Sequence, residues 1–307
     1  MSLNKKFSIK DKIELSKILE KIEIKFDQKQ TLDLLDDLHK KSRAHVIGVT
    51  GPPGVGKSSM INRLISNYRK NNFSVGVLAI DPSSRRSGGA LLGDRARFDI
   101  DPGDNKVFIR SMAAKDYLGG IAELTYPYMV VMRSIFDLVI VESVGVGQSE
   151  ISIEDVTDTV IYCVQPGSGD VIQFMKSGII EIPDIICVTK NDLEELSNNT
   201  VSDLLSSKSF FTNNLEWDIK ITSVSANKNQ GFNSLISLLD ERWVWLNKNE
   251  KLEGKRFFQD NEWIKKRITN RYGSKGLSIL EKKIETSSSP FSFFFNLEKK
   301  IIIRYQN

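Results

Sequence analysis

The chain has 307 residues, which is long enough for one large α/β domain with appendages or for two modest domains. Its hydrophobic content of 40% and charged content of 27% are typical of a soluble globular protein, and the net charge of +4 comes from scattered basic residues. No run of 18 apolar residues predicts a membrane span, and the polar start of the sequence lacks the apolar core of a secretory signal. We therefore expect a cytoplasmic protein that neither spans a membrane nor binds nucleic acid.

Cysteines and histidines are few. Cys163 and Cys187 each lie in an apolar run that is typical of a buried strand, which predicts reduced core residues. His39 and His45 are the only histidines, and the sequence has no C-x-x-C pair or histidine-rich tract. This composition argues against a transition-metal site.

The N-terminal part of the chain has a helical pattern. Between residues 10 and 40, leucines and isoleucines recur at i, i+3, i+4 and i+7, first from Leu15 to Ile22. We predict one or two helices that lead into the core domain, and we assign residues 1–42 to an N-terminal helical extension.

Residues 51–58 fit the P-loop pattern G-x-x-x-x-G-K-[ST], with an apolar strand before them and a helical pattern after them. The glycines allow positive φ angles, so successive backbone N–H groups can form a concave anion site at the start of the helix. Lys57 is expected to reach the β- and γ-phosphates of a nucleotide, and the Ser58 hydroxyl to contact Mg²⁺. The residues expected to contact the nucleotide here are Gly51, Gly54, Val55, Gly56, Lys57, Ser58 and Ser59.

Two acidic residues follow the P-loop helix. Asp81 comes after the apolar run 73–80, so it would lie at the carboxyl edge of a parallel sheet near Mg²⁺ or the γ-phosphate, or else serve as a turn or cap residue. Asp94, in the segment 83–98, is a candidate second Mg²⁺ contact. The arginines of this segment could lend charge to a phosphoryl transition state or could simply be solvated.

Residues 137–150 resemble a Walker B strand, with four apolar residues followed by an acid, and a glycine-containing loop. Glu142 would hold Mg²⁺ through water, and Gly145 would let a backbone N–H meet the γ-phosphate in a loop of the GTPase switch type. Gln148 is the one candidate for a dedicated catalytic glutamine. The predicted catalytic residues are Lys57, Asp81, Glu142 and Gln148, and the predicted metal ligands are Ser58, Asp81, Asp94 and Glu142.

The tetrapeptide of residues 189–192 follows a buried strand and matches [NT]-K-x-D, the guanine-reading motif. The Asp192 carboxylate can accept hydrogen bonds from guanine N1–H and N2–H₂, which adenine lacks, so adenine would leave that carboxylate unpaired. Lys190 would lie along the base, next to Thr189. We therefore expect the chain to bind GTP or GDP together with Mg²⁺.

A last loop completes the expected base site. Ser225, Ala226 and Asn227 follow a strand at residues 219–221 and fit the position where backbone N–H groups meet guanine O6.

The order of strands and helices predicts an α/β fold with a mostly parallel P-loop NTPase sheet flanked by helices and with helical N-terminal and C-terminal extensions. We assign residues 43–231 to the P-loop GTPase domain and residues 232–307 to a helical C-terminal arm. The arm is apolar and has no catalytic signature, so we expect it to mediate dimerisation or partner docking, or to pack back on its own core.

Several long stretches carry a family resemblance: G-V-T-G-P-P-G-V-G-K-S-S, A-I-D-P-S-S with G-G-A-L-L-G-D-R, F-I-R-S-M-A with L-G-G, V-E-S-V-G-V-G-Q-S-E, and P-G-S-G-D. Through them, residues 15–270 resemble the MeaB/ArgK family of P-loop GTPases. The resemblance implies a cytosolic, usually homodimeric GTPase. It also implies that the protein binds an adenosylcobalamin-dependent acyl-CoA mutase, typically methylmalonyl-CoA mutase, and gates cofactor loading or protects that enzyme.

The loop 165–176 resembles an extra switch of this family, which couples nucleotide state to the mutase. Its implied coupling residues are Asp170, Gln173 and Lys176. The chain departs from the family pattern at Arg85-Arg86, where a proline–aromatic pair is usual, and at Thr189, where asparagine is commoner.

Two other functions are compatible with this fold class. A P-loop ATPase or kinase for amino-acid (arginine or ornithine) transport, the role attached to the ArgK name, would need an acceptor pocket and a base, and binding of ADP as well as GDP would favour it. A nickel- or metal-insertion GTPase would need thiol and imidazole ligands, which two cysteines and two histidines hardly supply.

Overall fold

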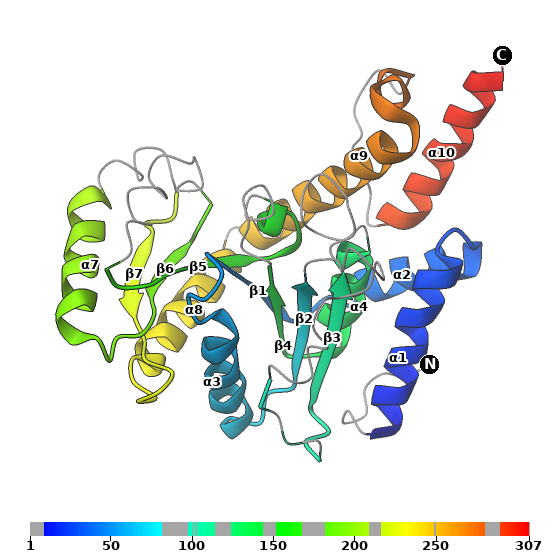
Figure 1. Ribbon diagram of the computed structural model, residues 1–307. Coiled ribbons are helices and arrows are strands. Elements are labelled where there is room, and N and C mark those ends of the chain that lie inside the picture. Colours follow the sequence, from blue (N-terminus) through cyan, green and yellow to red (C-terminus); the bar gives the residue numbers. More distant parts are fainter. Residues whose placement is uncertain are drawn as a thin grey trace, which may run out of the picture.

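The computed structural model describes residues 9–81, 98–99, 101, 103–113, 124–143, 152–167, 182–208, 216–248, 250–279 and 289–306. Within these residues, the centre of the chain is a β-sheet (Figure 1). Its strands are β1 (His45–Thr50), β2 (Val75–Asp81), β3 (Val107–Ala113), β4 (Leu138–Glu142), β5 (Thr159–Val164), β6 (Ile185–Val188) and β7 (Lys220–Ser223). They are ordered β3-β2-β4-β1-β5-β6-β7, and each neighbouring pair is parallel. The predicted α/β class is confirmed, and the described sheet is parallel throughout.

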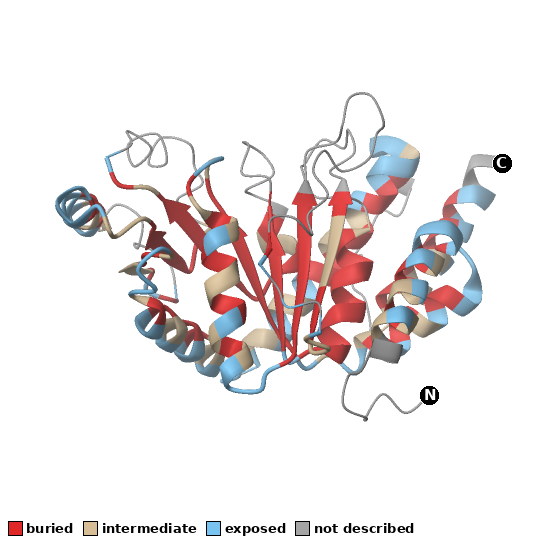
Figure 2. Cartoon of the chain, turned by 60° about the horizontal axis from the view of Figure 1, so that its bottom comes forward, coloured by how far each residue is buried: buried red, intermediate tan, exposed pale blue. Residues whose placement is uncertain are grey.

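The strands are apolar because both faces of the sheet are covered. Successive residues of a strand point to opposite faces, so Val46 of β1 belongs to one hydrophobic cluster and Ile47 to the other. Every residue of β1, β4, β5 and β6 is buried (Figure 2). This explains why these strands are continuous apolar runs in the sequence rather than alternating patterns.

Helices form the outer layers. One face of the sheet packs against α3 (Lys57–Lys70) and α8 (Phe232–Leu246). The other face packs against a cluster built from α1 (Ile9–Lys25), α2 (Lys29–His39), α4 (Thr125–Ile135), α9 (Lys251–Ile279) and α10 (Pro290–Gln306). At the β7 end of the sheet, α7 (Glu194–Ser207) packs on β6 and β7 (Figure 1). The predicted boundary at residue 231 directly precedes α8, which packs in the same core as the P-loop helix α3.

The described part of the C-terminal arm packs back on its own chain. The Asp36 carboxylate of α2 accepts hydrogen bonds from the backbone N–H groups of Phe291 (3.0 Å) and Ser292 (2.9 Å), which satisfies donors at the start of α10. Phe291 and Phe294 then pack on Trp263 of α9, with ring centroids 4.8 and 5.6 Å apart. Of the two expectations for the arm, packing on its own core is confirmed for these residues.

The parallel sheet brings the sequence motifs to one edge. Because all seven described strands run in the same direction, the segments that follow them meet at the carboxyl edge of the sheet. The P-loop follows β1, Glu142 ends β4, Thr189 follows β6 and Ser225 follows β7.

Candidate nucleotide-binding site

The P-loop has the backbone conformation that its glycines predict. The φ angle is +136° at Gly51, +76° at Gly54 and +102° at Gly56, a region that L-residues with side chains rarely adopt. A Cβ atom at Gly51 would also come within 2.4 Å of the Cys163 carbonyl oxygen on β5. Helix α3 begins at Lys57, so the positive end of its dipole lies at this turn.

Lys57 is buried and is held inside the P-loop. Its Nζ donates hydrogen bonds to the carbonyl oxygens of Gly51 (2.7 Å) and Pro52 (3.1 Å). A fixed ammonium beside a turn with positive φ angles and a helix N-terminus makes this region electropositive. That combination is suited to bind the phosphates of a nucleotide.

Ser58 and Glu142 come together at the junction of β4 and α3. The Ser58 Oγ donates a hydrogen bond to Oε1 of Glu142 (2.8 Å), and the Glu142 side chain is buried. Both groups are hard oxygen donors, the type that Mg²⁺ prefers, and they lie next to the phosphate-binding turn. The described residues therefore fit a magnesium ion shared by the P-loop serine and the Walker B acid.

A second hydroxyl pair fixes the ends of the two central strands. The Ser143 Oγ donates to Thr50 Oγ1 (2.7 Å), and the Ser143 N–H donates to the carbonyl oxygen of Val49 (3.0 Å). These buried contacts set the separation between the P-loop and the Walker B carboxylate. Thr50 and Ser143 were not predicted as site residues, although two hydroxyl residues at the ends of apolar strands are a usable signal.

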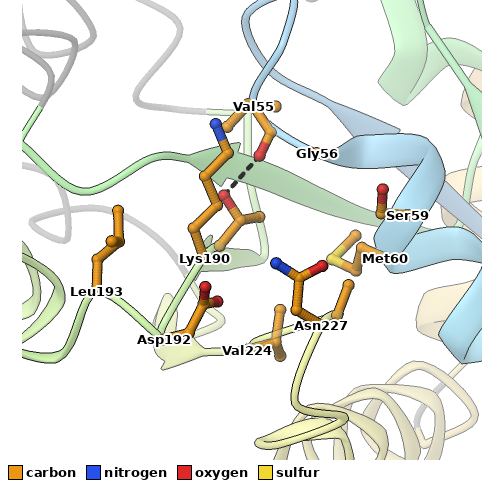
Figure 3. A pocket seen from close by; sticks show the side chains of 11 residues that line it. Val55, Gly56, Ser59, Met60, Lys190, Asp192, Leu193, Val224 and Asn227 are labelled. Carbon is orange, nitrogen blue, oxygen red and sulfur yellow. Dashed lines mark hydrogen bonds between the residues drawn. The ribbon is translucent and has the colours of Figure 1, made fainter.

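A pocket of about 190 Å³ lies beside the P-loop (Figure 3). Its walls come from the P-loop and α3, from the segment after β6, and from the segment after β7. The lining residues are Val55, Gly56, Ser59, Met60, Thr189, Lys190, Asp192, Leu193, Val224, Ala226 and Asn227. The structure thus brings the predicted base-reading residues of two separate segments to one cavity that adjoins the phosphate site.

Asp192 is the acidic group of this pocket. Its Oδ1 accepts a hydrogen bond from the Ser225 hydroxyl at 2.6 Å, and that hydroxyl in turn accepts the Lys228 N–H at 3.1 Å. The hydrogen bond from Ser225, together with the Asp192 backbone and the Asn227 side chain, lowers the pKa of the Asp192 carboxyl below its usual value. An ionised carboxylate is a pure acceptor, so it favours a base with an N–H edge.

Thr189 and Lys190 connect this pocket to the P-loop. The Thr189 hydroxyl donates to the Val55 carbonyl oxygen (2.6 Å), a contact drawn in Figure 3. Lys190 donates from its Nζ to the Gly54 carbonyl oxygen (3.0 Å) and to Oε1 of Gln165 (2.8 Å). Lys190 thereby joins three segments: the P-loop, the base-reading motif and the start of the segment after β5.

Some predicted residues lie outside the described part of the chain. The side chain of Asp81 is among them, although its backbone ends β2. Asp81 lies two residues beyond Ala79, and Ala79 is in register with Glu142. The other predicted residues that lie outside the described ranges are Asp94, Gly145, Gln148, Asp170, Gln173 and Lys176, together with the pair Arg85-Arg86.

The two cysteines are free and buried, as expected for core residues. Burial raises the pKa of the Cys163 thiol to about 12 and that of Cys187 well above its usual range, so neither is poised to ionise. Among the described residues, no group of three or more histidine, cysteine, aspartate or glutamate side chains could hold a metal ion.

Two contacts of the site were invisible to the sequence motifs. Gln165 meets Lys190 across 25 positions of sequence, and Arg63 of α3 donates from Nε to the Ala226 carbonyl oxygen (2.8 Å) across 163 positions. The motifs that contain Lys190 and Ala226 do not identify these partners, because the pairing is made by the fold.

The parallel sheet, the P-loop with its serine–glutamate contact, and the adjoining base pocket with an ionised aspartate define a P-loop nucleotide-binding protein. Comparison with known proteins then gives the family. A family model described as "Methylmalonyl Co-A mutase-associated GTPase MeaB" matches residues 15–278. The chain belongs to this family and is a P-loop GTPase.

Individual relatives agree with that family. The chain is 40% identical over 228 residues to a Pyrococcus abyssi protein named "Putative GTPase", covering 72% of this chain and 69% of the relative. It is 33% identical over 245 residues to the "Methylmalonic aciduria type A homolog, mitochondrial" of Caenorhabditis elegans, covering 77% of this chain and 61% of that protein.

A solved structure supports the fold. The crystal structure of an "LAO/AO transport system kinase" matches with a TM-score of 0.67 at 21% identity, covering 97% of this chain and 94% of that one. Among the helices that the structure describes, none has the length and apolar character that crossing a bilayer requires.

Proposed function

We propose that this GTPase acts on an adenosylcobalamin-dependent acyl-CoA mutase of the methylmalonyl-CoA mutase type, and that its nucleotide state gates cofactor loading or protects that enzyme. The family match over residues 15–278 supports the partner class. The observation that carries the nucleotide assignment is the Asp192 carboxylate, which accepts a hydrogen bond from Ser225 in the pocket beside the P-loop. We further propose a cytoplasmic homodimer; the two free, buried cysteines support a reducing compartment.

The phosphate end of the site has residues for binding and for metal coordination. We assign Lys57 to the β- and γ-phosphates, and Ser58 and Glu142 to Mg²⁺, with Glu142 acting through water. Their contact at 2.8 Å supports the assignment, since one ion can be reached by both groups. When bound, Mg²⁺ would neutralise charge that develops on the phosphate oxygens. Asp81 and Asp94 are proposed as further acidic groups near the metal.

The reaction is hydrolysis of GTP to GDP and phosphate. A water oxygen attacks the γ-phosphorus, the bond to the β–γ bridging oxygen breaks, and GDP leaves with that electron pair while a proton is released. The chain's own contribution is to hold the phosphates with Lys57 and the P-loop amides, and we propose that the amide of Gly145, in the loop after β4, meets the γ-phosphate. We propose Gln148 as the residue that orients the water, and we expect slow turnover without the partner.

The base end of the site selects guanine. Asp192 would accept hydrogen bonds from N1–H and N2–H₂, and the amides of Ala226 and Asn227 would meet O6. Adenine has an amino group where guanine has O6 and lacks the N1 proton and the 2-amino group, so it would offer Asp192 no donor beyond the one that Ser225 already supplies. We therefore expect GDP to bind far more tightly than ADP.

The coupling to the mutase is proposed to run through the loop 165–176. Gln165, its first residue, accepts a hydrogen bond from Lys190, which also bonds to the P-loop carbonyl of Gly54. Nucleotide binding can therefore act on the first residue of this loop, Gln165, through Lys190. Asp170, Gln173 and Lys176, farther along, are the proposed residues that respond to the mutase.

The decisive experiment measures phosphate release from GTP, with ATP as control, by the purified protein alone and with the host's adenosylcobalamin-dependent acyl-CoA mutase. We expect turnover of GTP only, and a faster rate with the mutase. A rate that is indifferent to every such mutase of the host would overturn the partner assignment. Turnover of ATP would overturn the guanine assignment and favour the transport-kinase alternative.

A matched pair of variants sharpens the base assignment. Asp192→Asn should reduce GDP affinity by on the order of 10-fold or more, because the amide cannot accept from both N–H groups of guanine in the same way. Asp203→Asn makes the same chemical change on an exposed face of α7 and should leave GDP binding as it is. Equal effects of the two variants would contradict the assignment.

A further inference from the structure

Arg63 lies in the second turn of α3, six residues after the P-loop lysine, and is half-buried. Its Nε donates a hydrogen bond to the carbonyl oxygen of Ala226, at 2.8 Å. Ala226 is in the loop after β7 and lines the base pocket. A side chain of the P-loop helix is therefore bonded to the backbone of the loop that adjoins the base.

The loop that Arg63 contacts is closed on itself. Ser225 and Gln230 exchange two backbone hydrogen bonds, at 3.0 and 3.1 Å, and the Ser225 hydroxyl accepts the Lys228 N–H. Those bonds fix the shape of the loop, but they do not fix its position relative to the P-loop. The Arg63 bond does so, because it joins the loop to the helix that starts at Lys57.

The bond also orients a peptide group. In a trans peptide, the carbonyl of one residue and the N–H of the next point in opposite directions. With the Ala226 carbonyl turned to Arg63, the Asn227 N–H points away from Arg63, and Asn227 lines the pocket. Hydrogen bonds to a carbonyl also polarise the peptide, which makes its N–H a better donor.

The guanidinium of Arg63 is well suited to hold the Ala226 carbonyl. A guanidinium stays charged at any physiological pH, and hydrogen bonds from charged donors are stronger than those between neutral groups. The positive charge lies on the carbonyl side of this peptide, opposite the Asn227 N–H, and strengthens that N–H as a donor. That favours an electronegative atom such as a carbonyl oxygen over an amino group.

We propose that Arg63 is a positioning residue for guanine recognition: it fixes the loop 225–227 so that the amides of Ala226 and Asn227 read O6, while Asp192 reads the N1 and N2 edge. This inference rests on the proposed binding of guanine nucleotides. It divides base recognition between two groups, the Asp192 carboxylate and the loop amides, which the hydrogen bond from Ser225 to Asp192 joins.

The test measures binding of three diphosphates to the full chain: GDP, IDP, which lacks the 2-amino group, and the 2-aminopurine riboside diphosphate, which lacks O6 and the N1 proton. Arg63→Met keeps the apolar stem and removes the donors. It should weaken GDP and IDP by on the order of 10-fold, and should leave the 2-aminopurine nucleotide unchanged because that base cannot make the O6 contact. Arg63→Lys, which keeps a charged donor, should recover part of the loss.

Arg69→Met is the matched control. Arg69 lies on the same helix but pairs with Asp104 at 2.7 Å, away from the base pocket, so all three affinities should stay at their original values. Equal weakening of all three nucleotides in Arg63→Met, or no weakening of GDP, would overturn the inference. If the original chain fails to prefer GDP over ADP, the proposed guanine binding itself fails, which is a separate result.

Discussion

The two edges of the sheet use buried and half-buried carboxylates in opposite ways. At the carboxyl edge, Glu142 and Asp192 accept hydrogen bonds from neutral hydroxyls, those of Ser58 and Ser225. At the amino edge, Asp158 pairs with Arg256 through two bonds of 3.0 and 2.8 Å. A carboxylate with a neutral partner keeps its full negative charge for a ligand, whereas one paired with an arginine is already neutralised.

A second ion pair shows the same use of arginine at the amino edge. Asp184 pairs with Arg242 at 2.7 Å, and the guanidinium carbon lies over both Trp217 and Trp245, 4.8 and 4.2 Å from their ring centroids. Asp184 also accepts the Val160 N–H, so it joins two strands and α8. Partner type thus separates the acids that we assign to ligand binding from the structural ones, although both sets follow or precede apolar strands in the sequence.

The largest expected effect is on the stability of the amino edge of the sheet. Asp158 is buried; burial would raise the pKa of its carboxyl, and the Arg256 charge and hydrogen bonds outweigh this and hold it below its usual value. Arg256→Met would leave that charge buried without its partner, so unfolding free energy should fall by about 3–5 kcal/mol. Denaturant titration measures it, and nucleotide affinity should be unaffected.

The matched control for this prediction is an exposed ion pair. Lys208→Met removes the partner of Asp218, whose side chain is 59% exposed, and should cost at most about 1 kcal/mol. A loss in Arg256→Met as small as in the control would mean that the amino edge does not depend on its ion pairs, and the contrast between the edges would disappear.

The next largest expected effect is on GTP turnover and concerns Glu142, at the carboxyl edge of the sheet. Glu142→Gln keeps the shape of the side chain and its contact with the Ser58 hydroxyl but removes the charge that we assign to Mg²⁺. We expect GTP turnover to fall on the order of 100-fold, with a higher magnesium requirement and little change in unfolding free energy. Turnover as a function of magnesium concentration measures this. A variant with normal turnover but reduced stability would place Glu142 with the structural acids.

Most of the carboxyl edge of the sheet could be predicted from the sequence and little of the amino edge, for a physical reason. The P-loop, Glu142 and the segment 189–192 are contiguous strings at strand ends, so local pattern and strand direction were enough to place them together. Asp158 and Arg256 are 98 positions apart, and nothing local distinguishes them from solvated charges. The return of α10 to α2 likewise depends on the Asp36 carboxylate, which local patterning cannot assign to a helix 255 positions away.

The amino edge should also make stability depend on pH. His45 is buried there, stacked on Trp243 with ring centroids 4.6 Å apart and bonded to the Thr159 hydroxyl (2.7 Å). Burial lowers the pKa of His45 from 6.5 to about 4; the Asp158 charge opposes this shift, while the charges of Arg256, Arg242 and Lys255 add to it.

The sign follows from the lowered pKa. The unfolded chain binds a proton at His45 below pH 6.5 and the folded chain does not, so stability is lost as pH falls from 6.5 towards 4. Between pH 7 and pH 5 the loss should be about 2 kcal/mol. His45→Gln, which can still bond to Thr159, should remove this part of the pH dependence. An unchanged pH profile in that variant would show that His45 does not titrate between the two states.

The smallest expected effect tests whether the carboxyl edge of the sheet transmits nucleotide state. Gln165→Ala removes the acceptor that Lys190 uses at the start of the loop 165–176. Losing one such hydrogen bond changes an equilibrium constant by roughly 2- to 10-fold. We therefore expect the ratio of the mutase affinities of the GTP-bound and GDP-bound forms to fall by that factor. Asn198→Ala, which changes an exposed amide on nearby α7, is the control and should leave the ratio unchanged.

Because Lys190 also bonds to the Gly54 carbonyl, nucleotide binding should persist in Gln165→Ala. A variant that loses nucleotide binding altogether would show that Gln165 supports the pocket itself, and coupling would then have to run through another contact.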